Sequence, residues 1–218
     1  MAVYTKINRK EINIINKNFN IDKVISFKGI KQGIENTNYL LKSKKKKYIL
    51  TIFEKRVLQK EIPFFMKLMD NLNNSKINCP KPLKTRNNKY LIKLKNKTAC
   101  IVSFLEGKDK KILNINDCYT VGKTIARMHV VTNTMKLNRK NSMGIKNLKP
   151  LLESIKFKSK KFSNLKVFLN NNLKDINKNW PKQLPKGIIH GDLFIDNIFF
   201  EKNKLSGIID FYFAANDY

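Results

Sequence analysis

Cysteine, histidine, tryptophan and proline are scarce in this chain. Its 218 residues include three Cys, two His, one Trp and six Pro. The cysteines Cys79, Cys100 and Cys118 are odd in number and lack the paired spacing of zinc ligands, which argues against a disulfide framework and against a zinc site. We therefore expect free thiols, as is typical of a protein in a reducing cytosol.

Long apolar runs are also missing. No segment approaches the roughly 20 apolar residues of a transmembrane helix, and the N-terminus lacks the apolar core of a signal peptide. Hydrophobic residues still make up 42% of the chain, so a chain of this length can bury a core. The composition thus argues against a disordered or membrane protein and predicts a soluble, cytoplasmic one.

Acidic residues are too few to balance the basic ones, and the formal net charge is +29. Such a charge suggests nucleic-acid binding. However, the basic residues are 40 Lys and only 5 Arg, spread along the whole chain, whereas nucleic-acid readers concentrate charge on one face and use Arg for bidentate contacts. Lys, Asn and Ile all have A/T-rich codons. We therefore favour a biased genome composition and expect no specific nucleic-acid partner.

The most informative segment reads His-Gly-Asp-Leu-Phe-Ile-Asp-Asn, over residues 190–197. Asn197 follows Asp192 by five positions, the Asp-x-x-x-x-Asn spacing of the protein-kinase catalytic loop. Asp210 follows in the apolar context Ile-Ile-Asp-Phe. Phosphoryl transfer from ATP needs one carboxylate to orient and deprotonate the acceptor hydroxyl. It also needs an amide and a second carboxylate to hold Mg²⁺ against the phosphates.

The flanking residues predict how these groups meet. Residues 188–189 resemble a short buried strand that enters the loop, and residues 198–200 a strand that leaves it. A turn at 201–204 would then form a hairpin and return Asp210 to the side of Asn197. Each piece alone could be an exposed turn or an ordinary strand end. Together they favour a kinase site.

The first half of the chain has the pattern of a small sheet with packed helices. The residues Asn8 to Glu11 resemble a capping box, and residues 61–72 have helical spacing with Phe65, Leu68, Met69 and Leu72 facing inward. Strands are expected at 24–27, 39–41, 48–53, 90–94 and 99–105.

Beyond a hinge at 106–108 the pattern becomes helical, at 117–128 and from about 148 to 180. We predict an α+β, bilobal, protein-kinase-like fold with a β-rich N-terminal ATP-binding lobe (1–105) and a mainly helical C-terminal catalytic lobe (106–218).

In such a fold ATP lies between the lobes, and the turn-rich segment 29–38 would cover its phosphates, with Gly33 permitting close backbone approach. An ordinary strand-connecting turn is an equally good interpretation for any single residue there. Glu61 could orient a phosphate-binding cation. It could equally be a first-turn glutamate favoured by the helix dipole.

With these motifs the chain resembles the aminoglycoside phosphotransferase and choline kinase superfamily, whose motif is His-Gly-Asp-Leu-x-x-x-Asn followed by Ile-Asp-Phe. It is similar in particular to the bacterial homoserine kinases of that fold, through blocks spread over the whole chain. These blocks are 1–5, 27–41, 48–56, 61–69, 126–129, 139–144, 184–200 and 205–218. The blocks at 27–41 and 205–218 are specific to that group.

The resemblance implies Asp192 as catalytic base and Asn197 and Asp210 as Mg²⁺ ligands. It implies nucleotide contacts from three places: the phosphate segment (Gly33, Asn36, Thr37, Asn38), Glu61, and the backbone at the adenine edge (Ser103, Phe104, Leu105). The implied reaction, in a monomeric enzyme, is phosphorylation of L-homoserine by ATP to O-phospho-L-homoserine and ADP, a step toward threonine.

Two departures from the family pattern stand out. Many members carry Lys or Arg where this chain has Thr51, so the phosphate-contacting cation is unassigned. Lys55 is a candidate if the strand continues, because it shares the parity of residue 51. Members of the group also continue beyond the position of Tyr218. We therefore expect a fragment or truncated product, with an incomplete C-terminal lobe and doubtful activity.

Three rival functions stay open. One is another small-molecule alcohol kinase of the superfamily, acting on choline, ethanolamine or an aminoglycoside. Its cationic substrates call for an acidic pocket that 16 acidic residues make hard to locate. Another is an inactive ATP-binding fragment: the intact Asp192, Asn197 and Asp210 argue against it, and the expected truncation argues for it. The third, nucleic-acid binding, rests on charge alone and would show a steep salt dependence.

Overall fold

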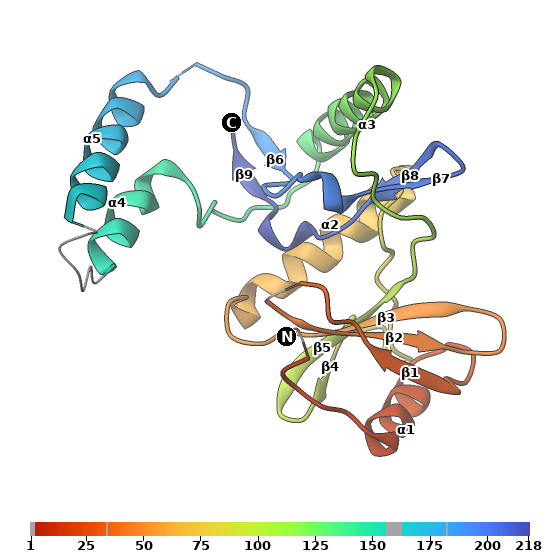
Figure 1. Cartoon of the computed structure of the whole chain (residues 1–218). Helices are drawn as coiled ribbons and strands as arrows, with labels where there is room; N and C mark the ends of the chain where they lie inside the picture. The colour runs from red at the N-terminus through yellow and green to blue at the C-terminus, as the bar shows by residue number, and fades with distance from the viewer. Residues whose placement is uncertain (1–2, 34, 156–162, 182) are drawn as a thin grey trace. The chain divides into compact units, whose positions relative to one another are not determined.

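The computed structural model describes residues 3–33, 35–155, 163–181 and 183–218. Its contacts divide the chain into two compact units. Unit 1 comprises residues 1–137 and 192–212, and unit 2 comprises residues 138–191 and 213–218 (Figure 1). We predicted a boundary between two lobes at residues 105/106, with a nucleotide between the lobes. These two contact units do not test that boundary, which stays a prediction. The predicted fold class is confirmed: a β-rich N-terminal part is followed by a mainly helical part.

Unit 1 contains a five-stranded antiparallel sheet in the order β1-β2-β3-β5-β4. Its strands are β1 (Ser26–Gly29), β2 (Thr37–Lys42), β3 (Lys47–Ile52), β4 (Leu91–Leu94) and β5 (Lys97–Ser103). β3 lies in the middle of the sheet, and its register places Thr51 opposite Asn38 of β2 and Cys100 of β5. The sheet thereby joins three segments that the sequence separates widely.

Helix α1 (Arg9–Asn18) begins with the capping box that the sequence predicts. The side chain of Asn8 accepts from the backbone N–H of the N3 residue, and the Glu11 carboxylate accepts from the backbone N–H of Asn8 at 2.8 Å. The helix buries Ile12 and Ile15 completely or nearly so, in a core shared with Leu41 and Leu50 of the sheet. It therefore covers one face of the sheet (Figure 1).

Helix α2 (Ile62–Asn74) follows the short 3₁₀ helix η1 (Gln59–Glu61). Its inward residues Phe65, Leu68, Met69 and Leu72 are buried as the spacing predicts. Helix α3 (Ile115–Asn133) is longer than the predicted 117–128, because a capping box of Asn114 and Asp117 starts it earlier.

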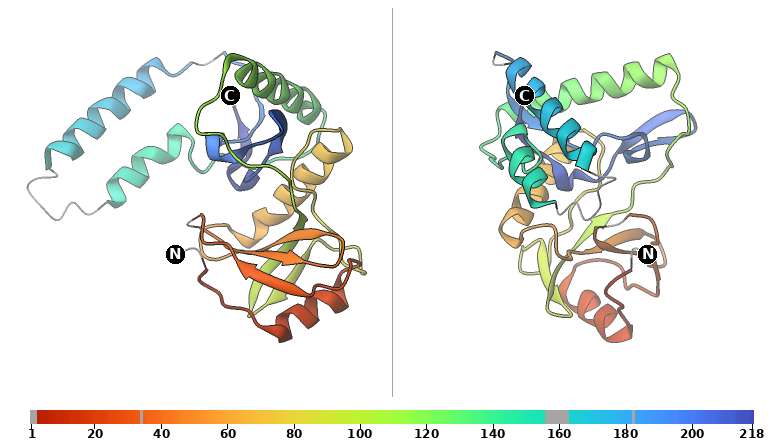
Figure 2. Two further views of the ribbon diagram at one scale, coloured as in Figure 1. Left: turned by 45° about the vertical axis from the view of Figure 1, so that its right-hand side comes forward. Right: turned by 60° about the vertical axis from the view of Figure 1, so that its left-hand side comes forward.

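The hairpin of β7 (Ile198–Glu201) and β8 (Lys204–Ile208) packs on α3, where Val121 meets Ile198 and Phe200. α3 also contacts α2 (Figure 2). Two 3₁₀ turns, η3 (Ile195–Asn197) and η4 (Phe211–Phe213), flank the hairpin. This arrangement fixes the ends of the hairpin, from which the predicted catalytic residues come.

Unit 2 contains α4 (Ile145–Ser154), α5 (Ser163–Asn179) and a two-stranded antiparallel sheet of β6 (Gly187–Ile189) and β9 (Ala215–Asp217). The predicted helical stretch from 148 to 180 corresponds to α4 and α5, and its residues 156–162 lie outside the described ones. The guanidinium of Arg139 donates to the carbonyl oxygen of Ala214 at 3.1 Å and so ties the segment before α4 to β9.

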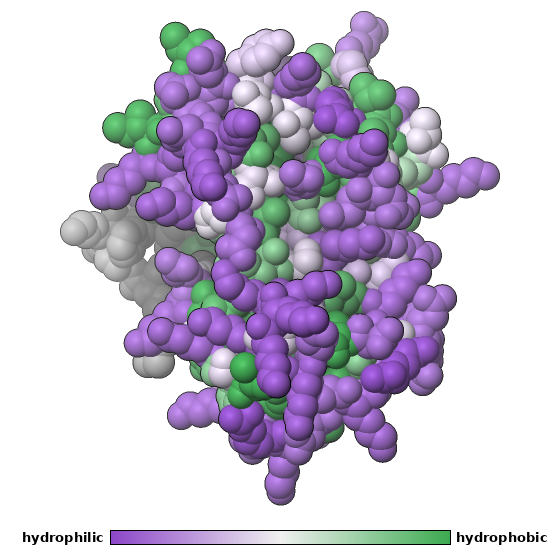
Figure 3. All heavy atoms as spheres, turned by 90° about the vertical axis from the view of Figure 1, so that its right-hand side faces the viewer, coloured by the Kyte–Doolittle hydropathy of each residue, from purple (hydrophilic) through white to green (hydrophobic). Residues whose placement is uncertain are grey.

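One face of the molecule shows how its hydrophilic residues are distributed. On the face shown in Figure 3, hydrophilic side chains are spread over the whole surface, with hydrophobic residues showing between them in small groups. Among the described helices, none combines the length and the apolar character that a membrane crossing requires.

Candidate active site

The loop after β6 brings Asp192 and Asn197 together through the Asn197 side chain. Its Nδ2 donates to the main-chain oxygen of Asp192 at 2.8 Å and to the carboxylate Oδ2 of Asp192 at 3.3 Å. The backbone N–H of Asn197 donates to the carbonyl oxygen of Phe194 at 3.0 Å, which forms the turn η3. The Asn197 side chain is largely buried. With its amide nitrogen used on Asp192, Asn197 has the oxygen Oδ1 to offer to a ligand.

The hairpin returns Asp210 to this loop as predicted. Ile198 pairs with Ile208, and the backbone N–H of Ile209 donates to the carbonyl oxygen of Asn197 at 2.9 Å. Asp210 follows immediately in the left-handed region, at φ 62°. A residue without glycine's freedom is held there only when its surroundings fix it, and such positions cluster at functional sites.

The surroundings of Asp210 disfavour its negative charge. Desolvation by the surrounding protein, then the Asp192 carboxylate and then the Glu35 carboxylate raise the pKa of Asp210 to about 6, against a backbone hydrogen bond from Tyr212 and the charge of Arg56. Although Asp210 is exposed at the surface, its partial desolvation and the two neighbouring carboxylates act in the same direction. Such a carboxylate gains most from a bound cation.

The donor atoms of this site suit a hard cation such as Mg²⁺. Asn197 offers an amide oxygen and Asp210 a carboxylate, and phosphate oxygens and water commonly complete the coordination of Mg²⁺ in such sites. Among the described residues, no three His, Cys, Asp or Glu side chains cluster closely enough to hold a metal by themselves. A metal here would therefore be shared between the protein and a phosphate ligand.

The predicted phosphate segment is fixed mainly by its own side chains. Gly33 is exposed and has φ 86°, a backbone conformation that favours glycine. Asn36 is buried and accepts from the backbone N–H of Glu54 at 3.3 Å, while Asn38 accepts from the Thr51 hydroxyl at 2.8 Å. These side chains shape the loop, and phosphate binding by it stays a prediction.

Thr37 belongs to a partly buried polar cluster, which we call the Glu54 cluster (Thr5, Thr37, Glu54 and Lys97). The fully buried Thr37 hydroxyl accepts from the backbone N–H of Thr5 at 3.1 Å and donates to Glu54 at 2.6 Å. Thr5 also donates to Glu54, at 2.7 Å, and the Lys97 ammonium forms an ion pair with that carboxylate. The Thr37 hydroxyl is thus used within the protein, which argues against a side-chain contact to phosphate.

The predicted adenine edge follows β5. The N–H of Ser103 donates to Lys81 at 2.8 Å, and that of Phe104 donates to Lys47 at a longer 3.4 Å. All three residues, Ser103, Phe104 and Leu105, are half-buried. Because the first two N–H groups are used within the protein, Leu105 is the residue of the three that we expect to meet adenine.

The structure contradicts the reasoning that made Lys55 a candidate cation. β3 ends at Ile52, so the strand parity that linked residue 55 to Thr51 does not extend to it, and Lys55 is exposed. Thr51 itself is buried and bonded to Asn38. Glu61 is half-buried at the end of η1, and its predicted role stays a prediction.

Sequence reasoning missed two features beside this site. Arg56 forms an ion pair with Glu35, which lies in the phosphate segment. Tyr212, two residues after Asp210, packs edge-to-face against Phe53 and Phe65 with ring centroids 5.2 and 5.6 Å apart. Neither contact has a local sequence signal, because each joins segments that are far apart in the chain.

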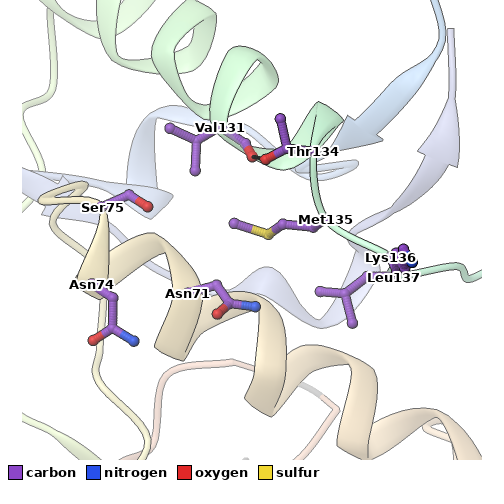
Figure 4. Close-up of a pocket in the computed structure, with 8 residues that line it drawn as sticks. All are labelled: Asn71, Asn74, Ser75, Val131, Thr134, Met135, Lys136 and Leu137. Atoms are coloured by element: carbon purple, nitrogen blue, oxygen red, sulfur yellow. Dashed lines mark hydrogen bonds between the residues drawn. The ribbon is translucent and has the colours of Figure 1, made fainter.

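A cavity of about 440 Å³ opens elsewhere in unit 1, between α2 and the end of α3 (Figure 4). It is lined by Asn71, Asn74, Ser75, Val131, Thr134, Met135, Lys136 and Leu137. None of the predicted site residues lines it. The candidate active site is therefore defined by the segments that precede β7 and follow β8, and not by this cavity.

Comparison with known proteins agrees with this geometry. Residues 26–218 match the family model described as the phosphotransferase enzyme family. A homoserine kinase of Parvibaculum lavamentivorans is 39% identical over 218 residues, which are the whole of this chain and 68% of that protein. A homoserine kinase of Paramagnetospirillum magneticum is 40% identical, over the whole chain and 69% of that protein.

Solved structures share the fold at lower identity. An amicoumacin kinase in complex with AMP-PNP, Ca²⁺ and Ami aligns with 97% of this chain and 66% of its own, at a TM-score of 0.74 and 15% identity. A spectinomycin phosphotransferase in complex with ADP and spectinomycin covers 97% of this chain and 71% of its own, at a TM-score of 0.67 and 16% identity. With the family model matching most of its length, the chain belongs to the phosphotransferase enzyme family.

Proposed function

We propose that the chain transfers the γ-phosphoryl group of ATP to the hydroxyl of L-homoserine, giving O-phospho-L-homoserine and ADP, a step toward threonine. The observation that carries the reaction type is the bonded pair of Asp192 and Asn197 with Asp210 returned beside it by the hairpin. The acceptor is supported by the homoserine kinases that match the whole chain at 39–40% identity.

In this proposal Asp192 is the catalytic base. Its carboxylate accepts the proton of the homoserine hydroxyl as the oxygen–phosphorus bond forms and the bond from the γ-phosphorus to the bridging oxygen of ADP breaks. The amide of Asn197 holds the Asp192 carboxylate in place. The proton leaves later with solvent, and no covalent enzyme intermediate is needed.

Asn197 and Asp210 would hold Mg²⁺, whose chemistry when bound is to neutralise charge on the phosphate oxygens. Gly33 and the segment from Asn36 to Asn38 would shape the cover over the phosphates, and Leu105 would meet adenine.

A coupled assay of ADP release tests the proposal. The purified chain is supplied with Mg²⁺ and ATP and with homoserine, choline, ethanolamine or kanamycin, and products are identified by mass spectrometry. We expect turnover with homoserine alone and its loss in Asp192→Asn. Turnover with choline or kanamycin but not homoserine would contradict the proposed acceptor. Binding of ATP without turnover on any acceptor would favour an inactive ATP-binding chain.

A further inference from the structure

The candidate site brings several negative charges together. Asn197 contacts the Asp192 carboxylate and accepts from the N–H of Ile209, the residue before Asp210, and the phosphates of ATP would add more negative charge at the same place. Repulsion between such groups is costly at short range unless cations offset it. A metal ion would offset part of it, and the sheet offers no cation at the buried Thr51.

Arg56 lies on a segment that is fixed beside residues 192–197 and 209–212, which we call the Asp210 loop. The segment between β3 and η1 is anchored at both ends by the buried side chains of Phe53 and Val57. Phe53 packs edge-to-face on Tyr212 at 5.2 Å between ring centroids, and Tyr212 follows Asp210 by two residues. The contact between these rings therefore joins the Arg56 segment to the proposed metal-binding loop.

The ion pair with Glu35 ties Arg56 to the phosphate segment as well. Glu35 lies two residues after Gly33, whose φ is 86°, and immediately before the buried Asn36. The pair is only partly shielded from solvent: 33% of the Arg56 side chain and 26% of the Glu35 side chain are exposed.

We propose that Arg56 is the phosphate-contacting cation of this site and that Glu35 is the positioning residue that aims its guanidinium. The proposal rests on the proposed phosphotransferase function and assigns the cation that Thr51 cannot supply. A guanidinium has five N–H donors in a planar fork, so it can serve a carboxylate and a phosphate together. Its charge would stabilise the phosphoryl group during transfer.

The test compares Arg56→Gln with Lys55→Gln, a matched loss of one positive charge at the neighbouring, exposed position. Affinity for MgATP and for AMP is measured by calorimetry, without homoserine. We expect Arg56→Gln to weaken MgATP binding about tenfold, as for a lost hydrogen bond to a charged group, and to leave AMP binding unchanged. Lys55→Gln should change both affinities less than about twofold, as surface substitutions usually do.

Turnover separates the two residues of the pair. Arg56→Gln should lower kcat/KM at least about a hundredfold, the usual effect of removing one transition-state donor. Glu35→Gln should lower it less, and the double variant should lose no more than Arg56→Gln alone, because Glu35 acts through Arg56. The double variant removes both charges together and so also serves if the single change impairs folding.

Several results would overturn the inference. They are MgATP affinity unchanged in Arg56→Gln, an equal loss of AMP affinity, or a larger effect of Lys55→Gln. If the unaltered chain bound no MgATP, the inference would fail with nucleotide binding itself. MgATP binding without homoserine turnover would instead remove only the proposed acceptor and leave the binding comparison of Arg56 decisive.

Discussion

The Asp210 loop and the Glu54 cluster are both polar assemblies of unit 1, yet they treat a carboxylate in opposite ways. Desolvation and the Asp192 and Glu35 carboxylates together raise the pKa of Asp210. Burial alone would raise the pKa of Glu54 too, but hydrogen bonds from Lys97, Thr37 and Thr5 and the Lys97 charge outweigh burial and lower it. The Asp210 carboxylate would be stabilised by a bound cation, whereas the Glu54 carboxylate already has Lys97 as its cation.

This difference separates a site built for a ligand from one built for the fold. The Glu54 cluster satisfies its polar groups internally and fixes the phosphate segment through Thr37. The Asp210 loop concentrates negative charge and backbone strain, which costs stability and is typical of functional sites. Substitutions in the loop should therefore change chemistry and binding, and those in the cluster should change stability.

The largest effect is expected from Asp192→Asn. The variant keeps the shape of the side chain and can still contact Asn197, but it cannot accept the hydroxyl proton. We expect kcat for homoserine phosphorylation to fall at least about a hundredfold, the usual contribution of a general base. ATP affinity, measured by calorimetry, should change little. Near-normal turnover would remove Asp192 from this role.

The second prediction concerns the pH dependence of metal binding at Asp210. With a pKa of about 6, this carboxylate is mostly charged at pH 7 and mostly protonated at pH 5. A metal ligand must be deprotonated, so Mg²⁺-dependent ATP affinity should fall about tenfold over that interval.

Asp210→Asn is the matched control for this pH dependence. The nucleotide itself binds protons in the same range, and the variant reports that contribution alone. We expect Asp210→Asn to bind MgATP weakly at both pH values and with a smaller pH dependence. Equal pH dependence in both proteins, with unchanged affinity, would make Asp210 a structural strand-end residue.

The third prediction tests whether Thr37, in the Glu54 cluster, serves stability and not phosphate binding. Thr37→Val keeps the shape but removes a hydroxyl that serves the N–H of Thr5 and the Glu54 carboxylate. Leaving such buried groups without a partner costs about 1–3 kcal/mol of unfolding free energy, measured by urea denaturation. Thr37→Ser retains the hydroxyl and should lose less. A Thr37→Val variant of unchanged stability that lost MgATP affinity would indicate direct phosphate binding instead.

The sequence predicted the Asp210 loop well because its parts are close in the chain. The spacing of Asp192 and Asn197, two apolar strands and a polar turn suffice to define a hairpin. The capping box of α1 and the buried face of α2 were predictable for the same reason, since both depend on residues three or four apart.

The Glu54 cluster and the pair of Arg56 and Glu35 could not be predicted in this way. The cluster joins residues of four segments, and its Lys97 lies 92 residues after Thr5. The parity argument for Lys55 required that β3 continue, and it fails because the chain leaves the sheet after Ile52. Contacts between distant residues depend on the order and register of the strands, and no periodic pattern in a single sequence predicts these.

The smallest effect is expected from Glu54→Gln. Glutamine can still accept from Thr5 and Thr37, so the variant loses mainly the ion pair with Lys97, which is 40% exposed. Pairs open to solvent contribute roughly 0.2–1 kcal/mol, and we expect a loss of this size in unfolding free energy at pH 7.

The sign of the pH dependence of this loss follows from the lowered pKa of Glu54. The stabilising effect is present above the ordinary glutamate pKa of the unfolded chain and disappears as pH falls through the lower, folded value. The unaltered chain and Glu54→Gln should therefore differ in stability at pH 7 and converge on acidification, in urea titrations at several pH values. A difference that grew toward low pH would mean that Glu54 is held uncharged. The cluster would then resemble the Asp210 loop instead of contrasting with it.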